Sequence, residues 1–459
     1  MSITPTPLQS NFPLNLQGAT EHLQSVVTEQ SRSAEYLDRR RRYMAALGKG
    51  TAIFCSPAEG ERGFRQSSDF YYLTGFDEPG AVLVLAPHHD RHQFILFVQP
   101  KNRDQEIWTG ARYGVGGAKE KFGADVVYAR EELDSQLFQY IQNADRLYYH
   151  MGSDQSFNHL IIKFWQTGLR HYQKRGIGPI AIEDPMPVLS KMRRVKSPQE
   201  IALMQRAADI AAKAHNQARE ITAPGRYEYE IAAEIEYIFH KSGGDLAYPS
   251  IVATGKNSCI LHYIANNQQM QDGDLLLIDA GCRYEYYCSD ITRTFPVNGK
   301  FTAPQKAIYE LVLAAQKQAI EQVKPGNFYH QIHEAAVKVI TEGLVDLGLL
   351  RGSVEELIKT EKYKSFYMHN TGHWLGIDVH DTGTYKQGEE GEPLQPGQVL
   401  TVEPGIYINA DQPVAIGQPV LLEQWRGIGI RIEDDVLVTP DGCEVLTSGV
   451  PKSVAEMER

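Results

Sequence analysis

The sequence has no excess of positive charge and no long hydrophobic run. Lys and Arg number 46 against 57 Asp and Glu, so the formal net charge is −11. Nucleic-acid binding needs clustered cationic residues, and we therefore expect no nucleic-acid partner. No apolar stretch approaches the roughly 20 residues that cross a bilayer, so we expect no membrane-spanning segment. The short basic cluster formed by Lys191, Arg193, Arg194 and Lys196 is interpreted as a solvated linker.

Cysteine is scarce and shows no pairing pattern. The chain holds five cysteines, an odd number, and no C-x-x-C motif. Neither a disulfide framework nor a cysteine-rich zinc site is expected, and the thiols are predicted to be reduced. No Lys or Arg precedes Arg32 and no apolar segment follows Met1, so neither a secretory signal nor an Arg-rich transit peptide is expected. These features together predict a cytoplasmic protein.

Length and composition predict more than one folded domain. A chain of 459 residues with 42% hydrophobic and 22% charged residues can build two full-sized cores. Residues 1–35 are expected to be a polar extension. Residues 36–184 alternate short apolar segments with helical ones, which predicts an α/β domain. The expected strands of this domain are residues 51–54, 81–86, 93–98 and 146–150.

Residues 185–459 are predicted to form a second domain, and they contain two similar pairs of helices. A capping box at residues 197–200 starts a helix that breaks at a Pro-Gly pair (224–225) before a second helix. The pattern returns at residues 304–305 and breaks at another Pro-Gly pair (325–326), and strand-rich sequence follows each pair. We interpret this as an internal duplication of α+β halves. If the halves face one another, a site between them would draw residues from both.

Three histidines occur in the segment HNTGHWLGIDVHD, residues 369–381. His369 and His373 have the spacing of the helical zinc motif H-E-x-x-H. The glutamate of that motif is missing, however, and Gly372 and Gly376 disfavour a helix. We therefore expect at most one of these histidines to bind a metal, with partners from elsewhere in the chain.

Four acidic residues stand in apolar, strand-like sequence. Asp279 ends the run DLLLIDAG, and Asp290 is expected in the next strand. Glu403 is expected inside the strand VLTVEPGIYI, and Glu433 alternates with isoleucines in GIGIRIEDD. Buried neighbouring carboxylates repel one another unless cations neutralise them, and Arg431 offers only one positive charge. The pattern favours two divalent ions in an oxygen-rich site with one imidazole, suited to Mn²⁺, Co²⁺, Fe²⁺ or Zn²⁺.

Five motifs in this order resemble those of the Xaa-Pro aminopeptidases (aminopeptidase P), metallopeptidases of pita-bread fold. The motifs are LLIDAG, SDITRTF, HNTGHWLGIDVHD, TVEPGIY and GIGIRIEDD. In addition, SSDFYYLTGFDEPG and EIWTGAR resemble the amino-terminal domain of the same enzymes. The resemblance implies an α/β amino-terminal domain followed by an α+β pita-bread catalytic domain whose halves are related by a pseudo-two-fold axis.

The resemblance also implies a dinuclear metal site as the catalytic centre. Two divalent ions, most suitably Mn²⁺, would be the cofactor, and a metal-bridging hydroxide would attack the Xaa-Pro bond. Only the middle histidine of the three would bind metal. The implied ligands are Asp279, Asp290, His373, Glu403 and Glu433.

Further roles follow from the same resemblance. Glu403 would act as general base, while His262 and His380 would orient the scissile carbonyl and stabilise the oxyanion. Arg431 and Tyr407 would fix the carboxylates in place. The expected substrate-binding residues are His262, His369, His380 and, in the amino-terminal domain, Asp69 and Trp108. For each of the three histidines, the alternative is a hydrogen-bonded structural histidine at the edge of the site. For Asp69 and Trp108, the alternative is a structural role in the core of that domain.

The implied substrates are peptides with proline at the second position, and the implied assembly is a homodimer or homotetramer. Prolidase, an Xaa-Pro dipeptidase with the same five ligands, is the nearest alternative. Methionine aminopeptidases usually lack the large amino-terminal domain, and non-catalytic pita-bread proteins lose ligands. One departure concerns Tyr385, since some aminopeptidases P have an arginine shortly after it whereas this chain reads KQGEEGEPL. Contacts to the distal part of longer peptides are therefore in doubt.

Overall fold

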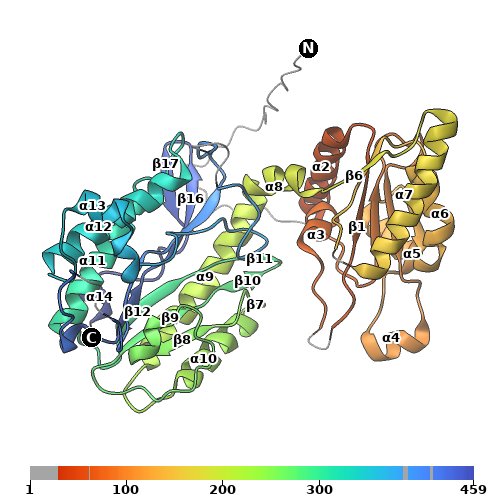
Figure 1. The fold of residues 1–459 in the computed structure, drawn as a ribbon. Coiled ribbons are helices and arrows are strands. Elements are labelled where there is room, and N and C mark those ends of the chain that lie inside the picture. Colours follow the sequence, from red (N-terminus) through yellow and green to blue (C-terminus); the bar gives the residue numbers. More distant parts are fainter. Residues whose placement is uncertain (1–28, 61–62, 153, 386–390, 414–416, 459) are drawn as a thin grey trace. The chain divides into compact units, whose positions relative to one another are not determined.

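The structure is a computed structural model that describes residues 29–60, 63–152, 154–385, 391–413 and 417–458. The described residues form two compact units, and the chain passes from one to the other between Arg193 and Arg194 (Figure 1). Most of the expected polar extension lies outside the described residues, while its last part belongs to helix α2 (Glu29–Leu47). Among the described helices there is none with the length and apolar character needed to cross a membrane.

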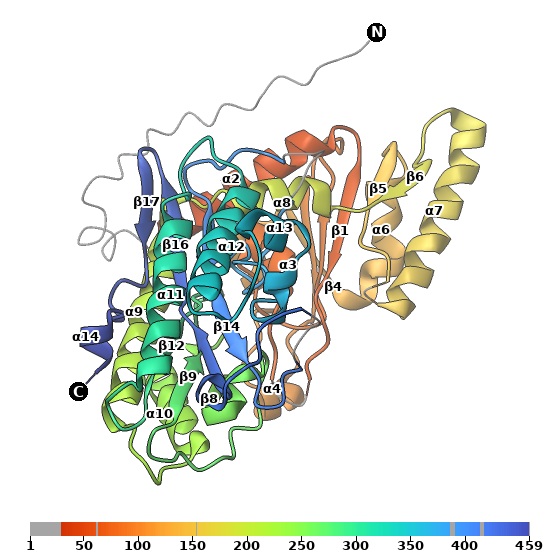
Figure 2. The same cartoon turned by 60° about the vertical axis from the view of Figure 1, so that its left-hand side comes forward.

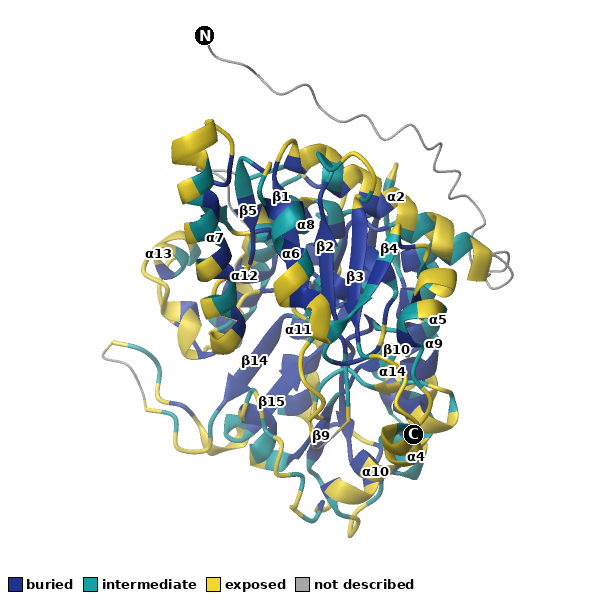
Figure 3. Cartoon of the chain, turned by 90° about the vertical axis from the view of Figure 1, so that its right-hand side faces the viewer, coloured by how far each residue is buried: buried dark blue, intermediate teal, exposed yellow. Residues whose placement is uncertain are grey.

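The amino-terminal unit contains a mixed sheet with the strand order β4-β3-β2-β1-β5-β6. The central strands β1, β2 and β3 are antiparallel, whereas β4, β5 and β6 join by parallel pairing. Runs such as VLVL and FILFV are buried along their whole length, which Figure 3 shows for β2 and β3. All four strands expected from the sequence are present. The bounds are β1 Thr51–Cys55, β2 Val82–Leu85, β3 Phe94–Val98, β4 Val126–Ala129, β5 Arg146–Tyr148 and β6 Ala181–Glu183.

Helices connect and flank these strands. Asn102 caps α4 by accepting the N–H groups of Asp104 and Gln105, and Asp154 caps α7 in the same way. The helices that follow α2 are α3 Ser68–Thr74, α4 Arg103–Thr109, α5 Gly114–Phe122, α6 Leu133–Ile141, α7 Gln155–Arg175 and α8 Met186–Arg194. The α/β character expected for this part of the chain is thereby confirmed.

The catalytic unit begins with the helix that the capping box predicts. Helix α9 (Pro198–Ile221) starts after Ser197, whose hydroxyl accepts the Glu200 N–H while the Glu200 carboxylate accepts the Ser197 N–H. Helix α10 (Glu228–Lys241) follows, and then an antiparallel sheet in the order β12-β9-β8. The strands of this first half are β7 Asp245–Leu246, β8 Ile251–Thr254, β9 Leu275–Asp279, β10 Cys282–Tyr284, β11 Tyr287–Cys288 and β12 Thr292–Pro296.

The second half repeats this order of elements. Helices α11 (Ala303–Ile320) and α12 (Tyr329–Asp346) lie side by side, as Figure 2 shows, and two antiparallel sheets follow them. These sheets have the orders β13-β16-β17 and β14-β15. The remaining elements are α13 Val354–Lys359, β13 Val399–Val402, β14 Gly405–Ile408, β15 Ile428–Arg431, β16 Asp434–Thr439, β17 Gly442–Val445 and α14 Val454–Met457.

Hydrogen bonds support the internal duplication. Gly225 follows α9 and donates its N–H to the Met270 carbonyl (2.8 Å), and Gly326 follows α11 and donates to the Leu394 carbonyl (3.1 Å). One hydrophobic core contains residues of all four long helices and of the sheets of both halves. The two halves are therefore packed as one body, with strand ends from both available for a shared site.

Candidate metal centre

The first half supplies two carboxylates. Strand β9 ends at Asp279, which lies opposite Thr292 of β12. Asp290 was expected in the next strand but precedes β12, because its N–H donates to both carboxylate oxygens of Asp435 (3.0 and 3.2 Å) instead of joining a ladder. The Tyr248 hydroxyl donates to Asp279 Oδ1 (2.5 Å) and also contacts Asp290 Oδ1. Tyr248 thus links the two carboxylates, and no sequence motif had indicated it.

A glycine after β9 permits this arrangement. A Cβ atom on Gly281 would lie 2.0 Å from the Ser289 carbonyl oxygen, a distance that no side chain allows. The β10–β11 hairpin can therefore fold back closely on the chain that follows Asp279. The DAG sequence of the motif is explained by this close approach of two backbones.

The second half supplies the histidine from an extended segment. Residues 371–375 run along β13, since the Thr401 N–H donates to the His373 carbonyl (2.9 Å) and the Glu403 N–H to the Thr371 carbonyl (2.7 Å). A Cβ atom on Gly372 would lie 1.9 Å from the Thr401 carbonyl oxygen. The exclusion of a helical two-histidine site is thus confirmed. Glu403, however, lies at the break between β13 and β14 and not inside a strand as expected.

Glu433 joins the two halves. It lies between β15 and β16, is buried, and donates its N–H to the Thr292 carbonyl (3.0 Å). The Thr292 hydroxyl donates in turn to Glu433 Oε2 (2.6 Å) and accepts from Arg431 Nε (3.1 Å). Arg431 also contacts Asp279 Oδ2 through Nη2 (2.5 Å) and Tyr407 through Nη1 (3.0 Å). Arg431 and Tyr407 therefore stand where they can fix the carboxylates.

The expected ligands come together from both halves. Asp290, His373 and Glu433 each offer an atom within 4.8 Å of the others, and they form the sole such group in the described part of the chain. His373 Nε2 lies 3.4 Å from Asp290 Oδ2 and 3.8 Å from Glu403 Oε1. Asp279 adjoins the group through Tyr248. The donors are four carboxylates and one imidazole, which suits hard or borderline divalent cations.

Electrostatics show what this cluster requires. Burial, together with the charges of Asp290 and Glu403, raises the pKa of Glu433 well above its usual range. Burial also raises the pKa of Asp279 and Glu403, although Arg431 opposes the shift at Asp279 and His373 opposes it at Glu403. Buried carboxylates that disfavour each other's charge are stabilised by a bound cation. The residues present therefore fit a divalent metal site.

Three further histidines were expected around the ligands. His369 Nε2 lies 2.9 Å from the Tyr407 hydroxyl, and burial, then Arg431, lower the pKa of His369 to about 3. His380 is exposed and stands edge-on to His373, with ring centroids 4.4 Å apart. His262 is exposed and has no hydrogen-bond partner in the described ranges. Its charge contributes to lowering the pKa of both His369 and His380, after the larger effect of burial.

The two residues expected from the amino-terminal unit differ in setting. Asp69 Oδ1 pairs with Arg193 Nη1 (2.8 Å) inside that unit, and Trp108 on α4 is 87% exposed. A structural role is therefore visible for Asp69, and Trp108 is not a core residue of that unit. Their contacts with substrate stay a prediction.

Apart from Lys191, which is exposed, the basic cluster is not the solvated linker that the sequence suggested. Arg193, Arg194 and Lys196 are all buried, because each charge has an acidic partner that is distant in sequence. Arg194 pairs with Glu392, and Lys196 Nζ lies 3.1 Å from Asp381 Oδ2. The prediction was wrong because local sequence does not reveal such partners.

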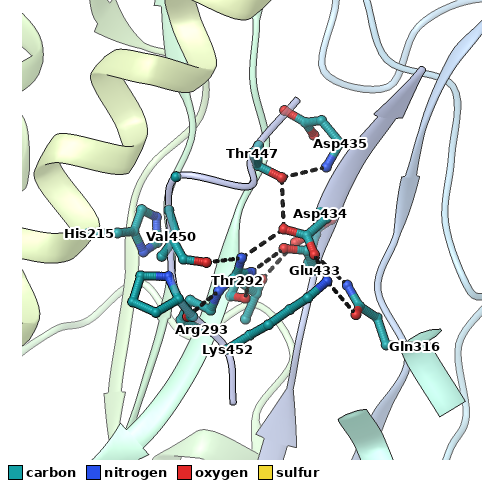
Figure 4. A network of polar contacts seen from close by, with 12 residues as sticks. His215, Thr292, Arg293, Gln316, Glu433, Asp434, Asp435, Thr447, Val450 and Lys452 are labelled. Carbon is teal, nitrogen blue, oxygen red and sulfur yellow. Dashed lines mark hydrogen bonds and ion pairs between the residues drawn. The ribbon is translucent and has the colours of Figure 1, made fainter. Parts of the chain in front are cut away.

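A second polar network contacts the Glu433 carbonyl and the side chain of the next residue, Asp434 (Figure 4). Arg293 donates from Nη1 to the Glu433 carbonyl (2.5 Å) and the Thr292 carbonyl (3.0 Å), and from Nη2 to Asp434 Oδ1 (2.7 Å). Asp434 Oδ2 accepts from Gln316 Nε2 (2.7 Å) and Lys452 Nζ (2.5 Å). The network ties β12, α11 and the carboxyl-terminal segment to the strand end that carries Glu433. The sequence analysis assigned no role to these residues, although Arg293 lies in the motif SDITRTF and Asp434 in GIGIRIEDD.

Comparison with known proteins agrees with this geometry. Residues 202–440 match the model of metallopeptidase family M24, and residues 36–149 match that of the aminopeptidase P N-terminal domain. The chain belongs to metallopeptidase family M24. For this M24 chain, the expected fold of an amino-terminal α/β domain and an α+β catalytic domain is confirmed.

Several relatives of this M24 member are similar over nearly its whole length. The Xaa-Pro aminopeptidases of Haemophilus influenzae and Escherichia coli are each 43% identical to it, over 92% of this chain and 96% of theirs. The structure of Pseudomonas aeruginosa aminopeptidase PepP matches with a TM-score of 0.88 and 46% identity, over 93% of this chain and 97% of that one. A zinc-substituted Escherichia coli aminopeptidase P in complex with product matches with a TM-score of 0.86 and 41% identity, over 94% and 97% of the two chains.

Proposed function

We propose that the chain is an Xaa-Pro aminopeptidase that releases the first residue of peptides with proline at the second position. The observation that carries this proposal is the group of four carboxylates and one imidazole from both halves of the carboxyl-terminal unit, in which Asp290, His373 and Glu433 offer atoms within 4.8 Å of one another and Asp290 and Glu433 are buried. Membership of family M24 and the similarity to Xaa-Pro aminopeptidases over nearly the whole chain support it.

The proposed cofactor is a pair of divalent ions, with Mn²⁺ favoured by the predominance of carboxylate oxygens and Co²⁺, Fe²⁺ or Zn²⁺ as alternatives. The residues that would hold them are Asp279, Asp290, His373, Glu403 and Glu433. When bound, such ions lower the pKa of a water molecule towards 7 and so supply a nucleophile at neutral pH.

The protein's own residues would then transfer the proton of the water and stabilise the negative charge that develops on the scissile carbonyl oxygen. Glu403 accepts the proton of the attacking water and returns it to the leaving proline nitrogen. His262 and His380 orient the scissile carbonyl and stabilise its oxygen as it becomes negative. Arg431 holds Asp279, and Tyr407 connects Arg431 to His369, so the carboxylates keep their orientation between turnovers.

The substrate preference follows from the chemistry of proline. An Xaa-Pro bond is a tertiary amide without an N–H, so an enzyme that grips an extended backbone through that group binds it poorly. A site that instead holds the carbonyl oxygen and the free amino terminus does not need the missing N–H. Asp69 and Trp108 are proposed to add contacts from the amino-terminal unit. We further propose a cytoplasmic homodimer or homotetramer.

The proposal is tested by cleavage assays with added Mn²⁺. The substrates are an Xaa-Pro-Yaa tripeptide, an Xaa-Pro dipeptide and a peptide without proline, and Asp279→Ala is the control. Release of Xaa from the tripeptide, abolished in the control, is the expected result. Cleavage of the dipeptide alone would instead identify a prolidase, and bound metal without any turnover would indicate a binding module.

A further inference from the structure

Glu228 is a buried carboxylate that the proposed chemistry does not use. It is the first residue of α10 and is 0% exposed. In the described ranges it has no Lys or Arg partner, and four hydrogen-bond donors surround it instead. Oε1 accepts from the Thr254 N–H (2.7 Å) and Asn257 Nδ2 (3.1 Å), and Oε2 accepts from the Tyr263 hydroxyl (2.8 Å) and the Gln268 N–H (2.8 Å).

These four donors are distributed along one loop and the strand end before it. Residues 255–268 join β8 to the strand region that leads to β9, and His262 lies in the middle of this loop. One oxygen of Glu228 binds Thr254 and Asn257 at the beginning of the loop, and the other binds Gln268 at its end and Tyr263, which directly follows His262. A single side chain on a helix, which is a rigid platform, thus holds the loop at its beginning, its middle and its end.

A second anchor fixes the loop on the side of the sheet. Asn266 adopts a left-handed conformation with φ of 43°, and its Oδ1 accepts the Val252 N–H (3.0 Å). Its Nδ2 donates to the Ser250 carbonyl (2.8 Å). Both contacts are made to the segment at the start of β8, so the loop is held from a second direction as well.

His262 has no such restraint of its own. Its imidazole is exposed and makes no hydrogen bond to any residue in the described ranges, yet its charge acts on His369 and His380 at the metal centre. The position of this imidazole therefore depends on the backbone of the loop that carries it.

We propose that Glu228 is a positioning residue that acts through His262 by holding both ends of the 255–268 loop. The inference rests on the proposed function, in which His262 orients the scissile carbonyl. A carboxylate is required because its two oxygens face four donors. Glutamine offers one oxygen and an amide N–H₂ group. The backbone N–H on the amide side (Thr254 or Gln268) therefore loses its acceptor, and the Asn257 amide or the Tyr263 hydroxyl on that side has to reorient.

The test is a double-mutant cycle on the Mn²⁺-loaded full chain. The variants are Glu228→Gln, His262→Ala and the two combined, with kcat and KM measured on an Xaa-Pro-Yaa tripeptide. Glu228→Gln is expected to lower kcat by between tenfold and about a hundredfold, because a displacement of a catalytic group by about 1 Å costs up to about a hundredfold in rate. In the His262→Ala background the same change is expected to lower kcat less than about twofold, because the group on which it acts is gone.

A matched control lies in the same helical turn. Glu230 caps α10 by accepting the Tyr227 N–H (2.7 Å) but makes no contact with the loop among the described residues, so Glu230→Gln is expected to keep the wild-type kcat. Mn²⁺ binding measured by titration calorimetry is expected to be unchanged in Glu228→Gln and Glu230→Gln. A Glu228→Gln variant that loses Mn²⁺ would overturn the inference, since its effect would then not run through His262.

Tyr263→Phe keeps the inference testable if Glu228→Gln does not fold. It removes one of the four donors and is expected to lower kcat in the wild-type background and not in His262→Ala. Effects that multiply in the double variants overturn the inference while leaving the proposed function intact. A wild-type chain without turnover, or a His262→Ala variant with the wild-type kcat, overturns the inference together with the role proposed for His262.

Discussion

The two halves of the catalytic unit hold their site loops by different chemistry on the same scaffold. In the first half, Glu228 at the start of α10 binds the His262 loop through four hydrogen bonds. In the second half, Tyr329 occupies the corresponding first position of α12. Its ring packs against Trp374 and Tyr385, with centroids 5.2 and 4.8 Å away, and these belong to the segment that carries His373 and His380.

The difference is possible because the start of each helix is fixed elsewhere. Glu230 accepts the Tyr227 N–H (2.7 Å) at α10, and Gln331 accepts the Phe328 N–H (2.8 Å) at α12. Because Glu230 and Gln331 already accept the N–H groups at the two helix starts, Glu228 and Tyr329 are not needed as caps. Each can instead contact the neighbouring loop. Glu228 meets a loop that presents hydrogen-bond donors, and Tyr329 meets one that presents aromatic rings.

The preceding helices show a related pairing. His215 on α9 is buried and its Nε2 lies 3.0 Å from the Ala280 carbonyl, next to Asp279. Gln316 on α11 is buried and donates to Asp434, next to Glu433. In each half, a polar side chain from a helix therefore binds the residue next to an expected ligand, at the Ala280 carbonyl in the first half and at the Asp434 carboxylate in the second, but only one of the two helix side chains can titrate.

The largest expected effect tests whether both halves are needed for the metal. Asp290→Asn removes a ligand of the first half and Glu433→Gln one of the second, and each is expected to lower kcat/KM by roughly a thousandfold or more, because the charge that binds the cations is lost. Tripeptide cleavage and metal content by mass spectrometry measure this. Glu423→Gln, a 95% exposed glutamate of the second half, is the control and should behave as wild type. Full metal content and rate in either ligand variant would rule out the proposed centre.

The next largest effect concerns the segment of the second half that carries His373 and His380. Lys196 and Asp381 form an ion pair in which both side chains are only 1% exposed. Lys196→Met leaves a buried carboxylate without its cation, which is expected to lower the free energy of unfolding by about 3–5 kcal/mol. Urea denaturation measures the loss, and Lys364→Met at an exposed pair is the control. A double variant with Asp381→Leu should recover much of it, and failure of Lys196→Met to destabilise would contradict the argument.

Of the corresponding residues His215 and Gln316, only His215 is expected to give a pH-dependent effect. Burial lowers the pKa of His215 from 6.5 to about 4 despite the bond to Ala280. Between these values the unfolded chain binds a proton that the folded chain excludes, so stability decreases as the pH falls from 6.5 to 4. The shift corresponds to about 3 kcal/mol, at about 1.4 kcal/mol per pKa unit.

His215→Gln, which copies the amide of Gln316, should remove this contribution. The free energy of unfolding is measured by urea denaturation at several pH values, and the difference between variant and wild type should change across the window. His240→Gln, an exposed histidine on α10, is the control and should show a smaller change. A pH-independent difference for His215→Gln would argue against a neutral buried imidazole.

The smallest effect compares two tyrosines, one from each half. Tyr263→Phe removes a hydroxyl that donates to the buried Glu228, and is expected to cost about 1.5–3 kcal/mol of unfolding free energy. The Tyr329 hydroxyl is buried without a hydrogen-bond partner in the described part of the chain, so Tyr329→Phe is expected to change stability by less than about 0.5 kcal/mol. Equal losses of unfolding free energy in the two variants, measured by urea denaturation, would contradict the difference between hydrogen bonding at Glu228 and aromatic packing at Tyr329.

Prediction from the sequence succeeded where the signal is local. The capping box at Ser197 predicted the start of α9, and Pro-Gly pairs predicted the breaks after α9 and α11. Glycines at positions 372 and 376 correctly excluded a helical zinc site. These features involve neighbours in sequence, whose conformational preferences do not depend on the rest of the chain.

Prediction failed where a partner comes from afar. Asp290 was expected within a strand, but its N–H bonds to Asp435, which is distant in the chain. Arg194 and Lys196 were expected in solvent, yet Glu392 and Asp381 bury them. Tyr248 and Lys452 had no motif at all. In each case the deciding contact joins residues that are distant in sequence and becomes visible only in the folded chain.

The sequence by itself indicated four carboxylates in apolar, strand-like sequence that need a cation. The proposed ligand set of Asp279, Asp290, His373, Glu403 and Glu433 came from the family resemblance of the motifs that contain them. Only the tertiary structure decided how these groups are held in place. Glu228 binds the loop that carries His262, and Tyr329 and Lys196 contact the segment that carries His373 and His380. Arg293 donates to the Glu433 carbonyl. The physical reason is that secondary structure follows from short-range preferences, whereas the orientation of a buried polar group depends on which donors and charges folding places around it.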